Sequence, residues 1–490
     1  MSTMLIKVPY LQVFEQHHQT AARYYPLGVG YISAYMKSQG HDVSLYDPEI
    51  QGLSDEVMLD RIANEKPKLI GLSSATPSFS RAMRMATAIR RVSDAVIVYG
   101  GVHASTFPEK VLEHNPQLDV TVVGEGEVTM TELATLVERG SHTSRTLSGA
   151  SGELGAVRGL CFRDGATVRK TLPRPLFDDV DALPFPDRES LDMDLYRATG
   201  HIGVSSRVAN LISSRGCPAR CTFCESFLTM GYRFREHSTE YVMREVRLLK
   251  ERYGVEQLVF NDDTFTMNRD RAKAICRALI RERLDLQWFC FARVNCGRDT
   301  ELMELMREAG CIHINLGVET GDPDVLKSIK KGTTLNLART TFKKCRELGI
   351  KTSAGFIFGF PTDTPDTMER TIEFAIELDP DVAFFNVLVP FPGTEVWKDF
   401  PALHGREHDP TFWDGFKTAS AGGLPIIELP NVSREELKRM VIRANRRFYL
   451  RPRFLWRQLT RIRSGYELKA NAIGAYELVS RNLRNLLLEV

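Results

Sequence analysis

The first 160 residues of this chain contain no cysteine, and the first of its nine cysteines is Cys161. An odd number of mostly isolated cysteines is typical of a reducing compartment rather than of a disulfide-stabilised fold. Long hydrophobic runs are also missing: none approaches the roughly 18 residues that span a bilayer. The segment from Met1 to Val8 is strand-like and lacks a signal-peptide pattern. We therefore expect a cytoplasmic location.

A strong charge of either sign is absent as well. The net charge is +2 at pH 7, whereas general nucleic-acid binders are strongly basic, so no nucleic-acid partner is expected. With 43% hydrophobic and 26% charged residues, the composition is that of a soluble globular enzyme. A chain of 490 residues is too long for one compact core and predicts two to four domains.

Three of the cysteines stand close together. Cys217, Cys221 and Cys224 follow an apolar segment, residues 208–212, that is expected to be a strand. Three such thiolates can bind a soft metal centre and leave one coordination position open, which is where metal centres do chemistry. The alternative is a zinc site with a distant fourth ligand. Zinc motifs usually pair CxxC with a second CxxC or with His, and no second CxxC pair occurs here.

The segment Arg215-Gly-Cys-Pro-Ala-Arg-Cys-Thr-Phe-Cys224 resembles the cluster-binding loop of radical S-adenosylmethionine (SAM) enzymes. The resemblance implies that Cys217, Cys221 and Cys224 hold a [4Fe-4S] cluster, whose fourth iron binds the amino and carboxylate groups of SAM. It also implies that Phe223 lies near the SAM adenine. A methylthiotransferase would need a second three-cysteine cluster near the N-terminus, so the cysteine-free first region disfavours that activity.

Residues 1–145 alternate short apolar segments with amphipathic helical patterns. This alternation predicts an α/β domain with a parallel, doubly wound, Rossmann-like sheet, whose ligands bind where strands end. The expected strands are residues 5–8, 43–46, 69–72, 95–99 and 120–123.

The loops of this region contain recurring glycines, in the segments 26–30, 73–78, 100–105 and 124–127. They resemble the loops of a cobalamin-binding domain that precedes the radical SAM domain in one large subfamily. The resemblance implies that glycines let the backbone approach a bulky planar ligand, and that helix N-termini meet the cobalamin tail. The implied cobalamin-binding residues are Gly28, Gly30, Ser73, Ser74, Gly100, Gly101, His103, Gly124 and Glu125.

One motif of stand-alone cobalamin domains, DxHxxG, is absent from this chain. The lower face of cobalt is therefore expected to meet a residue or water presented by residues 73–78, and His103 is expected to form hydrogen bonds within its loop. A Rossmann-like domain without cofactor is the alternative for this region.

Residues 146–200 predict a hairpin and a linker. The hairpin pairs residues 159–162 with 167–170 around Asp164-Gly165, and two prolines keep the connector 183–187 extended. Residues 201–400 alternate strands and helices six times, which predicts a partial (β/α)6 parallel barrel, the fold of the radical SAM family. The expected strands are residues 208–212, 257–260, 287–292, 312–317, 352–358 and 383–388.

Several polar residues follow these barrel strands, at the face where such barrels are active. By resemblance, Glu319 binds the SAM amino group or ribose, Asp262 or Asp263 orients SAM or substrate, and Arg293 neutralises a carboxylate. Gly359 is expected to shape the loop that borders the adenine. Each of them has an alternative role as a strand-end ion pair, helix cap or turn residue. Among the scattered cysteines, three could act as a thiol acid or base: Cys290, Cys296 and Cys311.

Residues 401–490 are expected to be mainly helical. Residues 434–463 contain eleven Arg or Lys with interleaved aromatic residues, which makes the segment basic and amphipathic. It is expected to cap the barrel mouth; the alternative is contact with an anionic membrane surface or an acidic substrate.

Together these features predict a cobalamin-dependent radical SAM enzyme that cleaves SAM reductively and methylates an unactivated carbon. The substrate would be a small molecule of secondary-metabolite, lipid or tetrapyrrole biosynthesis, and the electron would come from an external donor such as flavodoxin or ferredoxin. The alternatives are an anaerobic cyclase of the magnesium-protoporphyrin monomethyl ester type, a radical SAM enzyme without functional cobalamin, and a non-catalytic corrinoid carrier. No acid or base residue is assigned.

Overall fold

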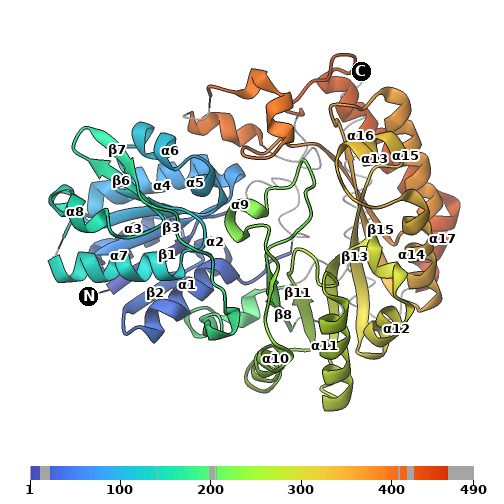
Figure 1. The fold of residues 1–490 in the computed structure, drawn as a ribbon, viewed down its shortest axis with the longest axis horizontal. Helices are drawn as coiled ribbons and strands as arrows, with labels where there is room; N and C mark the ends of the chain where they lie inside the picture. Colours follow the sequence, from blue (N-terminus) through green and yellow to red (C-terminus); the bar gives the residue numbers. More distant parts are fainter. Residues whose placement is uncertain are drawn as a thin grey trace.

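The computed structural model describes residues 2–10, 22–140, 142–197, 205, 207–406, 409–416 and 424–461. These residues form two large β-sheets with helices packed on them, one on the left and one on the right of Figure 1. A short helix, α9 (Phe227–Met230), lies between the two halves.

The first sheet has seven strands in the order β2-β1-β3-β4-β5-β6-β7. Its five parallel strands overlap the five predicted ones, whose apolar runs are buried between helices on both faces. The strand order reverses between β1 and β3, where doubly wound sheets form a ligand-binding crevice. The strands are β1 (Ser2–Lys7), β2 (Asp42–Tyr46), β3 (Leu69–Ser73), β4 (Val96–Gly100), β5 (Val120–Val122), β6 (Leu160–Asp164) and β7 (Thr167–Lys170).

Helices cover both faces of this sheet. The helix over residues 79–92 buries Phe79, Met83 and Ala86 on the side that meets the sheet, at the spacing of one helical face. The first and the last long helices, α1 and α7, pack side by side on the opposite face. The helices are α1 (Leu27–Ser38), α2 (Pro48–Gln51), α3 (Asp55–Glu65), α4 (Phe79–Val92), α5 (Val102–Thr106), α6 (Pro108–His114), α7 (Glu127–Gly140) and α8 (Ser151–Leu154).

The predicted hairpin is present, and it continues the first sheet. β6 pairs antiparallel with β5, and β7 pairs with β6. The linker that follows contacts both halves of the molecule. The backbone N–H of Asp187 donates to Gly30 of α1, and Arg188 donates to the Asn210 carbonyl of the second sheet at 2.7 Å. The linker is therefore fixed at both of its sides.

The second sheet is the predicted partial barrel of six parallel strands, in the order β15-β14-β13-β12-β11-β8. The strands are β8 (Val208–Leu211), β11 (Gln257–Phe260), β12 (Gln287–Arg293), β13 (Cys311–Glu319), β14 (Lys351–Phe358) and β15 (Val382–Val387). The helices that follow them are α10 (Thr239–Tyr253), α11 (Arg269–Glu282), α12 (Thr300–Glu308), α13 (Pro323–Ser328), α14 (Leu335–Glu347) and α15 (Pro365–Leu378). All six predicted strands are confirmed, with ends that shift by a few residues.

Both outer strands of the barrel are covered by other segments. Beside β8, the Asn210 side chain exchanges two hydrogen bonds of 3.0 Å with the backbone of Tyr25. Beside β15, the Tyr449 hydroxyl donates to the Ala383 carbonyl at 2.8 Å and accepts from its N–H at 3.1 Å. Uncovered edge strands would present unpaired backbone groups, so these contacts close the sheet.

The basic C-terminal segment folds back on the barrel as α16 (Arg434–Tyr449) and α17 (Pro452–Arg461). Arg443 and Arg447 pair with Glu369 of α15, and further arginines pair with Asp379. Those further arginines are Arg451, Arg453 and Arg457. The segment thus covers β15 and α15, and its remainder lies outside the described residues. Within the part of the chain that is described, no helix is long and apolar enough to cross a membrane.

Candidate active site

The cysteine loop leaves the C-terminal end of β8 and is closed at its base by a two-stranded ribbon. β9 (Ser214–Arg215) pairs antiparallel with β10 (Arg235–Glu236), so the segment between them returns to its starting point. Gly216 has φ 82°, and a Cβ there would collide with the Arg233 carbonyl. Glycine is therefore required directly before the first cysteine.

The three thiols are half-buried and free. Burial raises the pKa of Cys217 and of Cys224, and the Arg293 guanidinium lies 3.5 Å from the Cys221 sulfur. No three His, Cys, Asp or Glu side chains of the described ranges surround a single metal-ion position.

Glu319 ends β13 after a bulge, in the left-handed region at φ 71°. Its carboxylate forms an ion pair with Lys331, and both side chains are buried. The Lys331 ammonium lies 5.7 Å from the centre of the Phe223 ring. A non-glycine residue held in this conformation often marks a functional site. Sequence reasoning missed Lys331, whose only signal is a basic pair before Gly332.

The Glu319–Lys331 pair lies above two glycines in neighbouring strands. Gly317 and Gly355 are aligned in register, and a Cβ at Gly317 would lie 2.5 Å from the Glu319 carboxylate and 2.6 Å from the Lys331 ammonium. The absence of side chains here gives the ion pair its place beside the aromatic ring of the cysteine loop.

The loop after β14 begins with the predicted Gly359 and continues with Phe360. Phe360 packs against Phe223 with ring centres 5.5 Å apart. Gly359, at φ 92°, directs its Cα toward the C-terminal region, because a Cβ there would meet Ile427 at 3.0 Å and Leu437 at 3.5 Å. Phe360, rather than Gly359, therefore contacts the aromatic side chain expected near the adenine.

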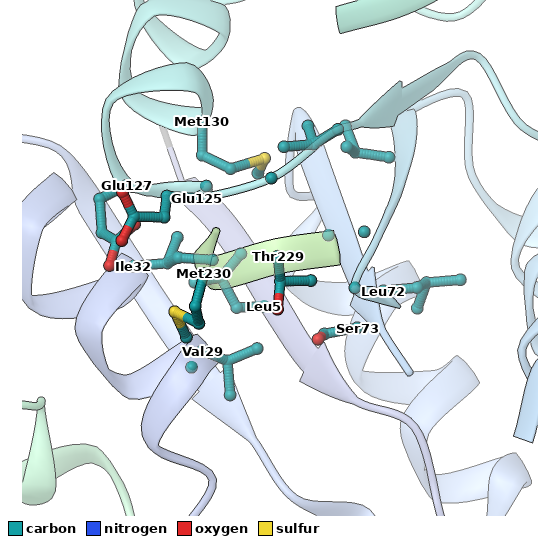
Figure 2. A pocket seen from close by; sticks show the side chains of 18 residues that line it. Leu5, Val29, Ile32, Leu72, Ser73, Glu125, Glu127, Met130, Thr229 and Met230 are labelled. Carbon is teal, nitrogen blue, oxygen red and sulfur yellow. The ribbon is translucent and has the colours of Figure 1, made fainter. Parts of the chain in front are cut away.

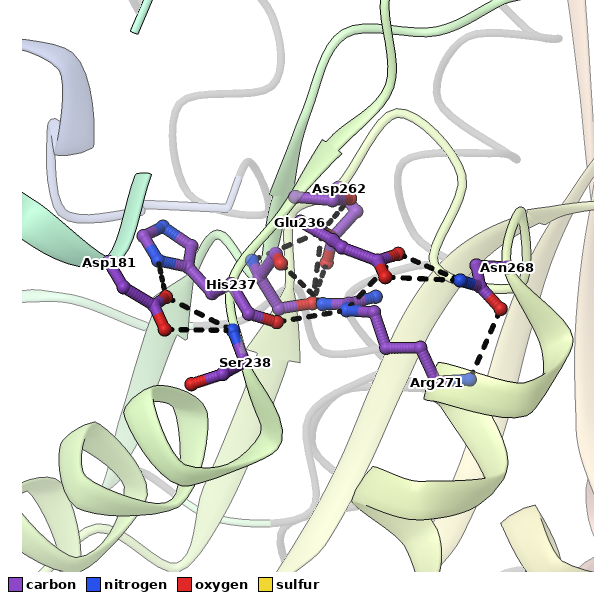
Figure 3. A network of polar contacts seen from close by, with 9 residues as sticks. Asp181, Glu236, His237, Ser238, Asp262, Asn268 and Arg271 are labelled. Carbon is purple, nitrogen blue, oxygen red and sulfur yellow. Dashed lines mark hydrogen bonds and ion pairs between the residues drawn. The ribbon is translucent and has the colours of Figure 1, made fainter. Parts of the chain in front are cut away.

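The two neighbouring aspartates have separate surroundings. Asp262 is fully buried and accepts hydrogen bonds from the Ser213 N–H at 3.1 Å and from the Ser213 and Ser214 hydroxyls. Arg271 donates to the Ser213 carbonyl in the same network (Figure 3). Asp262 thus supports the strand that leads into the cysteine loop, whereas Asp263 lies near the cysteines themselves.

A cavity of about 180 Å³ lies at the C-terminal edge of the first sheet. Figure 2 shows α9 beside this cavity, with Thr229 and Met230 among its lining residues. A Cβ built at Gly28 or Gly124 would meet no atom within 4 Å, so both glycines leave open space. The predicted residues that line the cavity are Gly28, Ser73, Gly100, Gly101, Gly124 and Glu125.

Three other predicted residues of this domain have structural contacts. A Cβ at Gly30 would lie 2.6 Å from the Tyr25 ring, and Ser74 exchanges a hydrogen bond of 2.8 Å with Tyr99. His103 is fully buried, and its ring centre lies 4.1 Å from that of Phe79 and 4.7 Å from that of Trp413.

Neither nitrogen of His103 has a hydrogen-bond partner among the described residues, and burial lowers its pKa to about 3. The expected hydrogen bonds of His103 within its loop are therefore wrong. The side chain is a neutral ring in an aromatic cluster that joins the first domain to the C-terminal region.

Glu125 lines the cavity, but its carboxylate is held by two arginines. It accepts from Arg215 at 2.9 Å and from Arg235 at 2.9 and 3.0 Å. Glu127 accepts from Arg215 at 2.8 Å. Burial lowers the pKa of Arg215, but the two carboxylates raise it by more, so its pKa is raised overall.

Five scattered cysteines meet in the barrel core although their spacing in sequence shows no motif. All are buried, and burial raises the pKa of four of them. They belong to the hydrophobic core shared by barrel strands and surrounding helices. The acid–base role left open for three of them stays a prediction: Cys290 lies inside β12, Cys296 lies in the turn after β12, and Cys311 begins β13. The five are Cys276, Cys290, Cys296, Cys311 and Cys345.

Two family models match this chain. The B12 binding domain model matches residues 18–134, and the Radical SAM superfamily model matches residues 211–375. An uncharacterized methyltransferase of Pyrococcus horikoshii, PH0819, is 33% identical over 432 residues, which cover 88% of this chain and 89% of that protein. The chain belongs to the cobalamin-binding radical SAM family.

Two further relatives share less sequence identity with this chain. The anaerobic magnesium-protoporphyrin IX monomethyl ester cyclase of Rubrivivax gelatinosus is 29% identical and covers 89% of this chain and 76% of its own length. The structure of the radical SAM methyltransferase TsrM from Kitasatospora setae, with cobalamin and a [4Fe-4S] cluster bound, matches with a TM-score of 0.66 and 21% identity. The match covers 82% of this chain and 74% of TsrM, and it confirms the fold.

As a cobalamin-binding radical SAM enzyme, the protein uses a [4Fe-4S] cluster, SAM and cobalamin, and it requires a reductant. The described residues fit these groups. The cysteine loop offers three sulfur ligands and no fourth, and the first sheet offers an apolar cavity with two glycines open toward it.

Proposed function

We propose that this enzyme transfers a methyl group to an unactivated carbon of a small molecule, and that the cysteine loop and the glycine-lined cavity act together. The observation that carries the proposal is the position of α9, which begins three residues after Cys224 and supplies Thr229 and Met230 to the cavity wall. The cluster site and the cobalamin site thus share one short segment of chain.

The proposed roles follow from the contacts. Cys217, Cys221 and Cys224 hold the cluster, and Arg293 contacts the Cys221 sulfur. Lys331 and Glu319 offer opposite charges at the barrel mouth, which suits the zwitterionic methionine part of SAM.

When bound, the reduced cluster supplies the electron that cleaves SAM, and cobalamin supplies the methyl group. The protein itself binds and orients these groups and excludes water. Phe223 and Phe360 provide an apolar surface for the adenine, and Asp263 lies where it can orient SAM or substrate. Gly28, Ser73, Gly100, Gly101 and Gly124 form the surface for cobalamin.

The barrel interior is the proposed place of the substrate. Phe384 of β15 is aligned in register with Gly355 of β14 and keeps 41% of its surface exposed. A large exposed aromatic side chain in the middle of a barrel strand suits an apolar substrate surface.

Oxidative cyclisation is the second candidate function, because the Rubrivivax cyclase matches nearly the same share of this chain. Methylation is favoured by the P. horikoshii relative at 33% identity and by two named methyltransferases. These are the cytidylyl-2-hydroxyethylphosphonate methyltransferase of Streptomyces wedmorensis, at 28% identity, and the hopanoid C-3 methylase of Methylococcus capsulatus, at 27%.

Anaerobic reconstitution followed by iron, sulfide and corrinoid analysis tests the proposal. After reduction with SAM and candidate substrates, 5′-deoxyadenosine and S-adenosylhomocysteine are measured. We expect both products in equal amounts. 5′-Deoxyadenosine without S-adenosylhomocysteine would favour cyclisation, and iron without corrinoid would favour a cobalamin-independent enzyme. The absence of both products would contradict radical chemistry.

A small redox protein such as flavodoxin or ferredoxin is the proposed electron donor, in a cytoplasmic setting. For the basic segment, the pairing of five arginines with Glu369 and Asp379 supports the role of an internal cover. Flotation with neutral and anionic vesicles tests the membrane alternative. Binding that requires anionic lipid would favour it.

A further inference from the structure

A buried network of four charges joins the first domain to both flanks of the cysteine loop. Glu125 and Glu127 come from the loop after β5 and the start of α7, whereas Arg215 and Arg235 lie in the paired strands β9 and β10. The ion-pair distances are 2.8–2.9 Å, and each of the four residues is at most 8% exposed. Two positive and two negative charges balance one another.

The network also holds the segment that separates the two cofactor sites. Arg235 donates to the Met230 carbonyl at 2.8 Å, at the end of α9, and to the Phe177 carbonyl of the linker at 2.9 Å. Arg215 lies 4.9 Å above the ring of Tyr31 in α1. The same two arginines therefore fix the entry to the cysteine loop, its exit, and the wall of the cavity.

Burying such a network costs desolvation free energy that is not needed simply to hold two domains together. Taking four charges out of water is unfavourable, and well-packed hydrophobic residues hold domains together at least as well. Ion pairs with several hydrogen bonds add a defined geometry, because the planar guanidinium donates in fixed directions and so restricts the orientation of its carboxylate partners. The network is thus suited to setting a position.

We propose that Glu125, Glu127, Arg215 and Arg235 are positioning residues that set the separation between the cysteine loop and the cobalamin cavity. The proposal rests on the proposed function of these two sites. A fixed separation would let one substrate carbon lose its hydrogen atom to the 5′-deoxyadenosyl radical formed beside the cluster and then, as a carbon radical, take up a methyl group held at the cavity. A loosened loop would still cleave SAM, but fewer cleavages would end in methyl transfer.

The test compares Glu127→Gln and Arg215→Lys with a matched control, Glu245→Gln. Glu245 pairs with Arg188 at 2.8 Å, and both side chains are 1% exposed, so the control breaks an equally buried pair between linker and barrel. The other contacts of Arg188 are with the Asn210 carbonyl and the Tyr25 ring, which lie outside residues 216–231. A second control is Glu132→Gln. Glu132 belongs to α7 itself, is partly exposed and forms an ion pair with Arg174.

The first readout is hydrogen exchange of residues 216–231 in the reconstituted protein, which requires neither turnover nor corrinoid. We expect at least fivefold faster exchange in both network variants and no change in either control. The second readout is the magnetic interaction between the reduced cluster and cob(II)alamin, measured by electron paramagnetic resonance. We expect it to weaken or become heterogeneous only in the network variants.

The third readout is the ratio of 5′-deoxyadenosine to S-adenosylhomocysteine, which should rise severalfold in the network variants. Unchanged exchange in folded Glu127→Gln and Arg215→Lys would overturn the proposal, as would equal changes in Glu245→Gln. A wild-type protein without corrinoid or SAM cleavage would instead contradict the proposed function, and the exchange readout would still decide whether the network orders the loop.

Discussion

The two sheets of this molecule present their ligands with opposite kinds of surface. The cavity of the first sheet is lined mainly by glycines and apolar side chains, and its two carboxylates are neutralised by arginines. The barrel mouth instead gathers charge: Arg293 beside a cysteine, and Glu319 paired with Lys331. The first site therefore selects by shape and the second by electrostatics. A bulky cofactor suits the first, and a small zwitterion suits the second.

The largest expected effect separates the two sites completely. Cys217→Ala removes one of three cluster ligands, so we expect loss of bound iron and of 5′-deoxyadenosine formation, while hydroxocobalamin still binds. Iron analysis and corrinoid absorbance measure both. Cys345→Ala, in the barrel core, is the control and should keep its iron. Retention of a full cluster by Cys217→Ala would contradict the assignment.

The next change attacks the shape-selective site alone. Gly28→Leu places a side chain into open space at the cavity, so the chain should fold while hydroxocobalamin affinity falls at least tenfold. Iron content and formation of 5′-deoxyadenosine should persist. Gly149→Leu, where a Cβ also meets no atom within 4 Å, is the matched control. Equal cobalamin affinity in the two variants would show that the cavity is not the binding site.

A smaller effect is expected from charge removal at the barrel mouth. Glu319→Gln leaves Lys331 without its buried counter-charge, and we expect the Kd for SAM to rise about 10-fold, equivalent to ~1.4 kcal/mol. Cobalamin affinity should stay unchanged. Lys330 and Glu395 form the neighbouring exposed pair, so Glu395→Gln is the control and should alter SAM binding little. A lower cobalamin affinity of Glu319→Gln would contradict the assignment of the two cofactors to separate sites.

The same contrast explains what the sequence could predict. The strands and the cysteine array were readable because hydrophobic periodicity and CxxxCxxC spacing are local patterns. The glycine loops could be assigned as a group through their resemblance to a cobalamin-binding domain. The individual roles of these glycines were not, because Gly28 faces open space whereas Gly30 faces the Tyr25 ring.

Residues whose partners are distant in sequence were harder to assign. Asp262 meets Ser213 across 49 positions, and Glu127 meets Arg215 across 88. A carboxylate at a strand end has the same appearance in sequence whether it faces a ligand or supports a loop. The structure distinguishes the two cases by burial and by contact partners. On this basis Lys331, paired with Glu319, belongs to the site, whereas His103, without a hydrogen-bond partner among the described residues, does not.

The smallest expected effect concerns pH and tests the electrostatic side of the comparison. Beneath the mouth, Asp363 accepts hydrogen bonds of 2.9 Å from the N–H groups of Gly359 and Phe360, yet burial raises its pKa to about 6. A raised pKa favours the protonated native state, so this contribution is present at low pH and is lost as pH rises through about 6. Between pH 5 and 7, wild type should lose about 1 kcal/mol of unfolding free energy that Asp363→Asn does not lose. Anaerobic urea unfolding at both pH values measures the difference. Parallel pH dependence of the two proteins would mean that Asp363 ionises normally and that the barrel side tolerates a buried charge without cost.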